Sequence, residues 1–168
     1  MTETPQQYTQ RILGYVEGQE PLAVQRATAK TLARLIDGVP DEALRARPSP
    51  AHWSVGEILA HLADAEIVGA YRIRAILGSP GGPVAAYDQD AWAAAGRYTA
   101  RDPLKSLELF RVVREANLAL LESLAPEQWH DYGVHSERGR ESIEHLVRMF
   151  AGHDVNHMRQ IERILARA

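Results

Sequence analysis

Four segments of the chain carry apolar residues at the spacing of an amphipathic α-helix, and this periodicity constrains the fold more than any other feature. The segments begin and end at recognisable signals, such as Asp102 before Pro103 and Asp37 before Gly38. They cover residues 21 to about 37, about 55 to 77, 103 to 125, and 141 or 142 to the C-terminus. No set of segments alternates apolar and polar residues as half-buried strands do. The pattern therefore predicts an all-α fold, a four-helix bundle.

A length of 168 residues is typical of a single domain, so we expect residues 1–168 to form one bundle. Residues 1–20 are expected to be a short helical N-terminal extension. The connection between the second and third helices, residues 78–101, is too long for a simple antiparallel turn. We expect it to be a crossover that passes over one end of the bundle.

Charge and composition limit the kinds of molecule that the chain is expected to bind. Lys and Arg total 19 against 22 Asp and Glu, giving a net charge of −3 without a dense basic cluster, so we expect no nucleic-acid-binding face. No window resembles a membrane helix or a signal peptide, which predicts a cytoplasmic protein without membrane contact. The chain has no cysteine, which excludes disulfides and thiolate metal sites. Any thiol chemistry would therefore need a thiol brought by a substrate.

Two of the seven histidines, His153 and His157, are four residues apart and lie on one face of the last predicted helix. They interrupt its apolar stripe, so we expect both to be buried. Either each is a core histidine that is hydrogen-bonded to a carbonyl or to a carboxylate such as Asp154 or Glu57, or the pair binds a metal. Asp154 stands where the zinc-protease signature His-Glu-x-x-His has glutamate, which argues against a protease.

A third imidazole, His61, edges the apolar stripe of the second predicted helix. Three neutral imidazoles from two facing helices would form a divalent-metal site with coordination positions left for water or substrate, as catalytic sites have. The sequence thus offers His61, His153 and His157 as candidate metal ligands.

The other histidines are weaker candidates. His52 and His130 each adjoin a tryptophan in a polar loop and are expected to be exposed. His145 could point to the same cavity as His153 or lie at the surface. His135 precedes the last helix and could reach the mouth of the bundle.

Four segments resemble one known family. Trp53–Asp64 (WSVGEILAHLAD) and Gly152–Ile161 (GHDVNHMRQI) resemble the DinB-like superfamily of metal-binding four-helix proteins. Within it, Tyr87–Ala93 (YDQDAWA) and Gly133–Glu137 (GVHSE) are similar to segments of the YfiT-type bacillithiol S-transferase branch. The chain departs from that branch at Ser136, where proline is frequent, and at Ala65-Glu66, where Ser-His is frequent.

The resemblance implies an up-down-down-up bundle that pairs as a homodimer. It also implies a divalent ion held by His61, His153 and His157. Imidazole suits zinc, nickel, iron and copper alike, and we expect zinc or nickel. It carries no implication of DNA binding.

From residues and resemblance together, the leading hypothesis is a metal-dependent S-transferase. A low-molecular-weight thiol, bacillithiol-like, would lose its proton at the metal and attack an electrophilic small molecule. The alternatives are a metal-dependent hydrolase, which activates water, and a non-catalytic, stress-associated metal-binding protein.

Several further residues are tied to this hypothesis. Asp64, Glu57 or Asp154 could orient a ligand imidazole through its second nitrogen. In the crossover, Tyr87, Trp92 and Arg97 either line the substrate pocket or only cover the bundle.

Overall fold

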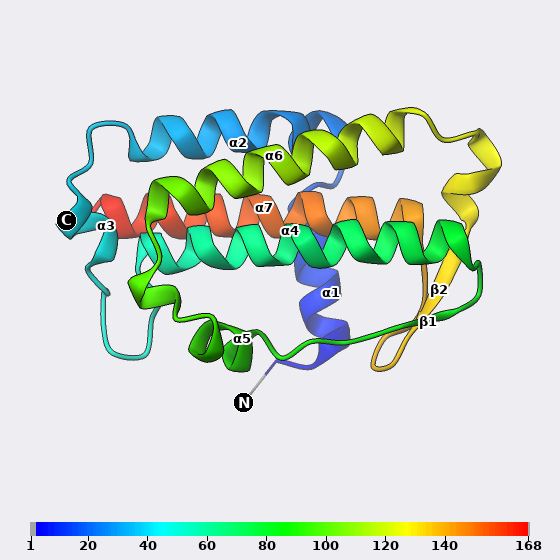
Figure 1. The fold of residues 1–168 in the computed structure, drawn as a ribbon, viewed down its shortest axis with the longest axis horizontal. Coiled ribbons are helices and arrows are strands. Elements are labelled where there is room, and N and C mark those ends of the chain that lie inside the picture. Colours follow the sequence, from blue (N-terminus) through cyan, green and yellow to red (C-terminus); the bar gives the residue numbers. More distant parts are fainter. Residues whose placement is uncertain (1–2, 168) are drawn as a thin grey trace.

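A bundle of four long helices forms the body of the molecule in a computed structural model, which describes residues 3–167 (Figure 1). The predicted all-α four-helix bundle is therefore confirmed, and none of the described helices is long and apolar enough to span a membrane. The elements follow in the order α1 (Pro5–Gly14), α2 (Pro21–Ile36), α3 (Asp41–Arg45), α4 (Val55–Gly78), β1 (Pro83–Val84), α5 (Gln89–Ala95), η1 (Tyr98–Ala100), α6 (Pro103–Glu122), η2 (Pro126–His130), β2 (Tyr132–His135), β3 (Gly139–Ser142) and α7 (Ile143–Leu165).

Side-chain caps set the starts of the long helices close to where the sequence predicts them. The Ser54 hydroxyl accepts the Glu57 amide, while the Glu57 carboxylate accepts the Ser54 amide, which fixes the first turn of α4. At α6, Asp102 directly precedes Pro103, and its carboxylate accepts hydrogen bonds from two first-turn amides. These caps satisfy amides that have no partner inside the helix.

The helices have the up-down-down-up order. α2 and α7 run in one direction along the bundle and α4 and α6 in the other (Figure 1). Because α4 and α6 are parallel, the chain must return along the whole bundle between them. The crossover therefore runs beside α4 and carries α5 and η1, whereas we expected it to cover one end only.

The structure also contains a small three-stranded sheet that the periodicity did not predict. β1 pairs in parallel with β2, and β2 pairs antiparallel with β3. Strands of two to four residues are too short to show an alternating pattern. Glu141 and Ser142 were the two expected starts of the last helix. Glu141 lies in the sheet, and Ser142 is the residue that caps α7.

The core consists of two apolar clusters separated by a buried polar layer. One cluster gathers around Ile58 and Phe110, and the other around Ile76 and Leu146. Between them lie Thr28, Glu66, Arg114, Asn117 and Asp154, all buried. Buried polar groups need partners, and these side chains hydrogen-bond to one another across the four helices.

The N-terminal extension is helical, as predicted, and packs on α7. Ile12 of α1 is fully buried. At the contact, a Cβ added to Gly152 would lie 2.2 Å from the Ile12 carbonyl oxygen, so the two backbones touch. Only glycine fits at position 152, one residue before a candidate metal ligand.

Gly152→Ala should lower the free energy of unfolding by roughly 1–3 kcal/mol, because the added methyl forces α1 and α7 apart. Urea denaturation followed by circular dichroism measures the change. Gly14→Ala is the matched control, since a Cβ there meets nothing within 4 Å. A Gly152→Ala protein as stable as the parent would contradict the described contact.

Candidate metal centre

The three predicted imidazoles meet in the bundle, although His61 lies 92 residues before His153 in the chain. The Nε2 atom of His153 lies 3.0 Å from that of His61 and 3.1 Å from that of His157. One ligand nitrogen from each ring lies within 4.8 Å of the others. Tetrahedral zinc, with nitrogens about 2.0–2.1 Å from the ion, holds them roughly 3.3 Å apart. The cluster therefore suits a divalent ion.

Burial keeps these imidazoles neutral, which is the form that binds metals. His61 is 1% exposed and His157 9% exposed. His153, which we expected to be buried, is only partly buried, because it forms part of a pocket wall. Burial, reinforced by His157, lowers the pKa of His61 to about 3. Burial also lowers the pKa of His157 to about 4 and, with the neighbouring imidazoles, that of His153 well below its usual value. Three imidazole nitrogen lone pairs are thus available within one small volume.

The second nitrogens of these rings have different surroundings. Nδ1 of His157 lies 3.0 Å from Oε1 of Gln160, so Gln160 fixes that ring with Nε2 toward the cluster. Nδ1 of His61 is buried and has no hydrogen-bond partner among residues 3–167, and the centroid of the Trp53 ring lies 5.0 Å from that of His61. Packing therefore orients His61, whereas a hydrogen bond orients His157.

The three carboxylates expected to orient an imidazole are engaged elsewhere. Glu57 pairs with Arg47, Asp64 accepts from Tyr98 and Arg101, and Asp154 pairs with Arg114. The prediction of a carboxylate partner was wrong, because Asp154 links helices, Asp64 holds the crossover, and Glu57 binds Arg47 in the segment between α3 and α4. Gln160 serves in that position for His157.

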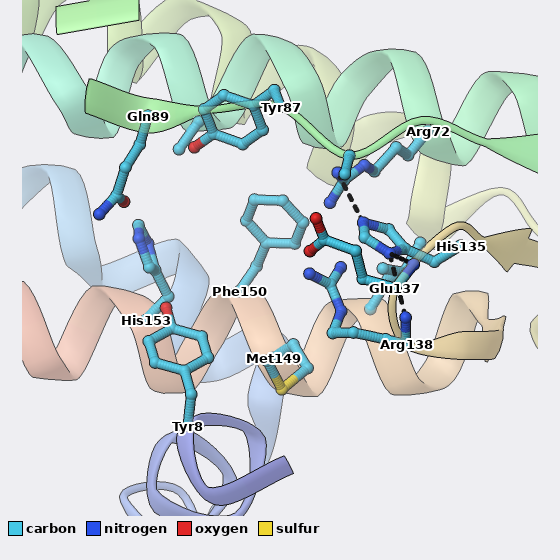
Figure 2. Close-up of a pocket in the computed structure, with 13 residues that line it drawn as sticks. Tyr8, Arg72, Tyr87, Gln89, His135, Glu137, Arg138, Met149, Phe150 and His153 are labelled. Carbon is cyan, nitrogen blue, oxygen red and sulfur yellow. Dashed lines mark hydrogen bonds between the residues drawn. The ribbon is translucent and has the colours of Figure 1, made fainter. Parts of the chain in front are cut away.

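A pocket of about 260 Å³ opens beside the cluster, and we call it the His153 pocket (Figure 2). His153 lies at one end, and Arg72 and His135 lie at the other. The walls between them are largely apolar and aromatic: Tyr8, Tyr87, Leu146, Met149 and Phe150. A small molecule could thus touch the cluster through one end while the opposite end meets cationic and polar groups.

The remaining sequence candidates divide between the pocket and the surface. His52 and His130 are exposed, as predicted. Tyr87 lines the His153 pocket, but Trp92 and Arg97 do not. His145 is partly buried outside the pocket lining.

The pocket and cluster residues that were not singled out from the sequence include Arg72, Gln160 and Tyr8. Arg72 follows His61 by three helical turns, so both lie on one face of α4, and this spacing was a usable signal. Gln160 lies one turn after His157 and was equally visible. Tyr8 could not be found, because nothing local shows that α1 folds back against the pocket.

Fold and site together define a four-helix-bundle protein with a buried three-histidine cluster suited to a metal ion. The chain belongs to the DinB superfamily, whose family model matches residues 23–161.

Known relatives are similar to this chain over most of their own length. A protein of Oceanobacillus iheyensis, named "Putative metal-dependent hydrolase", is 24% identical over 136 residues, covering 80% of this chain and 78% of the relative. A protein of Geobacillus kaustophilus with the same description is 25% identical over 152 residues, covering 90% and 85%. The structure of YfiT from Bacillus subtilis superimposes with a TM-score of 0.82 at 20% identity, covering 99% of this chain and 90% of that one. YfiT is described as "a probable metal-dependent hydrolase with an unusual four-helix bundle topology".

We predict one divalent ion per chain, bound through His61, His153 and His157, and each alanine variant should lose tight binding. Gln160→Leu should weaken binding about 10- to 100-fold, because the His157 ring loses its orienting partner. Nickel quenching of Trp53 fluorescence, with the other two tryptophans changed to phenylalanine, reports binding beside His61.

His52→Ala is the control for ion binding, since His52 is exposed and outside the cluster. Unchanged binding in His61→Ala, or weaker binding in His52→Ala, would show that the third ligand is another histidine.

The metal-free protein should lose stability as the pH falls from about 7 to about 5. Imidazoles of the unfolded chain take up protons near pH 6.5, whereas those of His61 and His157 stay neutral until about pH 3 and 4. The unfolded state then binds more protons, which lowers the free energy of unfolding by roughly 1–2 kcal/mol per ring at pH 5. Urea denaturation with a chelator measures this, and His153→Gln should flatten the dependence. Equal stability at both pH values would contradict buried, neutral imidazoles.

Proposed function

We propose that this protein is a divalent-metal-dependent S-transferase. It would join a low-molecular-weight thiol, bacillithiol-like, to an electrophilic small molecule. The family and the histidine cluster support metal-dependent chemistry. The choice of a thiol goes beyond them and rests on the surroundings of the cluster.

The observation that supports a thiol is that the acidic side chains near the cluster already form ion pairs. Asp64 and Asp154 both accept from arginines. Glu137 is the acid among the residues that line the His153 pocket, and it lies at the end with Arg72 and His135 (Figure 2). Activation of water in hydrolysis commonly uses a carboxylate base beside the metal. A thiol needs no such base at a divalent cation.

A bound divalent ion, zinc or nickel, would lower the pKa of a coordinated thiol from about 8.5, so that thiolate forms at neutral pH. His61, His153 and His157 would hold the ion, and Gln160 would keep the His157 ring turned toward it. The His153 pocket would hold the electrophile and exclude water. Sulfur then bonds to the electrophilic carbon, the leaving group departs with its electron pair, and the thiol proton passes to solvent.

The absence of cysteine is consistent with this scheme. The chain has no thiol of its own to compete for the ion or to be alkylated by the electrophile. Both the nucleophile and the electrophile would be small molecules. A homodimer in the cytoplasm stays a prediction from the sequence and the family resemblance.

Hydrolysis is the second candidate, because both curated relatives are named "Putative metal-dependent hydrolase". The two reactions differ in one requirement: hydrolysis proceeds without an added thiol. The same cluster and pocket would serve either nucleophile.

Cobalt-loaded protein should develop a sulfur-to-metal charge-transfer band when cysteine or 2-mercaptoethanol is added. The band should appear well below the free thiol pKa of about 8.5, because the cation stabilises thiolate. Conjugation to 1-chloro-2,4-dinitrobenzene should follow the same pH curve.

His130→Ala should behave as the parent, since His130 is exposed. His153→Ala should lose both the band and conjugation. Cobalt binding without a sulfur band, together with thiol-independent cleavage of an ester such as 4-nitrophenyl acetate, would favour hydrolysis instead.

A further inference from the structure

The far end of the His153 pocket contains the guanidinium of Arg72, whose buried charge and donors are only partly compensated. Arg72 is 5% exposed, lines the pocket, and forms no ion pair with any residue that the structure describes. Its Nη2 donates to the Ala85 carbonyl, but its Nε is buried without a partner. A buried charge of this kind is costly unless an opposite charge or an acceptor reaches it.

His135 lies beside Arg72 and faces donors on both sides of its ring. Nδ1 lies 3.1 Å from the Glu137 amide and 3.3 Å from the Arg138 amide, both of which donate to it. Nε2 lies 3.2 Å from Nη2 of Arg72, which is another donor (Figure 2). A neutral imidazole has one acceptor nitrogen, and the two amides require it at Nδ1.

The proton of His135 therefore lies on Nε2 and points toward the guanidinium. Two donors face each other, a mismatch that an acceptor placed against both would relieve. Hydrogen bonds from a guanidinium to an anionic acceptor are among the strong ones. The pair of Arg72 and His135 thus has the donor arrangement of an oxyanion site, and no carboxylate of the described residues hydrogen-bonds to either side chain.

We propose that Arg72 and His135 bind a carboxylate of the small molecule that fills the His153 pocket. In this arrangement the carboxylate lies at the far end, the apolar walls hold the middle of the molecule, and its reacting group meets the histidine cluster. The substrate class is accordingly a carboxylic acid with an apolar or aromatic body. Use of this site in catalysis rests on the proposed function, whereas binding of the carboxylate does not.

A carboxylate fits this site better than a phosphate dianion. Arg138 also lines the pocket, but its Nε and Nη2 already donate to Glu141. The Arg72 guanidinium and Nε2 of His135 suit the two oxygens of a carboxylate. Glu137 also lines this end of the pocket, and its negative charge disfavours a doubly charged ligand.

Calorimetric titration with 4-phenylbutyrate and its neutral isostere 4-phenylbutanamide tests the site. The full-length protein is first freed of metal with 1,10-phenanthroline and dialysed, so that the carboxylate cannot bind an ion instead. The parent should prefer the acid by about tenfold or more, as expected for charge-assisted hydrogen bonds. A phosphate analogue, 3-phenylpropyl phosphate, should bind more weakly than the acid.

Three variants assign the preference to particular groups. Arg72→Met should bind acid and amide equally, with the affinity for the amide unchanged. His135→Asn keeps an acceptor for the two backbone amides but removes the Nε2 donor, and should reduce the preference several-fold. Arg74→Met is the matched control, because Arg74 lies on the same helix outside the pocket and should leave the preference intact.

The proposal is overturned if the parent binds acid and amide equally or binds neither. Retention of the preference in Arg72→Met, with its circular dichroism unchanged, overturns it as well. Tighter binding of the phosphate overturns the assignment to a carboxylate. Acid-selective binding that Arg72→Met abolishes supports the carboxylate site even where thiol conjugation fails, and that failure would count against the proposed function alone.

Discussion

One buried guanidinium, that of Arg114, connects all four long helices. From α6 it donates to Asp154 of α7, to Glu66 of α4 and to the backbone carbonyl of Gln25 in α2. Thr28 of α2 completes the layer by donating to Asp154. Burial acts against the charge on Arg114, but the two carboxylates outweigh it and raise its pKa. Removing one partner of such a network leaves an uncompensated buried charge, at a cost of about 3–5 kcal/mol.

This network also sets the geometry of the histidine cluster. Asp154 is the residue after His153, so the contact with Arg114 fixes the rotation and axial position of α7 at His153. On α4, Glu66 is anchored in the same way five residues after His61. Ion pairing thus occupies the acids that lie beside the cluster, and it holds in register α4 and α7, the two helices that carry the three histidines. The imidazoles meet because a separate set of polar side chains aligns their helices.

The bundle and the cluster were predictable because both rest on helical spacing. Apolar periodicity and caps such as Ser54 and Asp102 located the long helices to within a few residues. His153 and His157 were recognisable because they replace apolar residues on an inward face. The sheet and the partners of the acids were not predictable, since they depend on contacts between distant segments. Asp64, for example, is held by Arg101 from a crossover whose path no local pattern describes.

The arrangement of α2 and α7 has a consequence for synthesis on the ribosome. Gln25, near the start of the bundle, donates to the Val147 carbonyl 122 residues later. The two halves of the histidine cluster are similarly separated, because His61 leaves the ribosome long before His153. Contacts between such distant positions form late and slow folding. The nascent chain therefore stays without its core and its histidine cluster until α7 has left the ribosome.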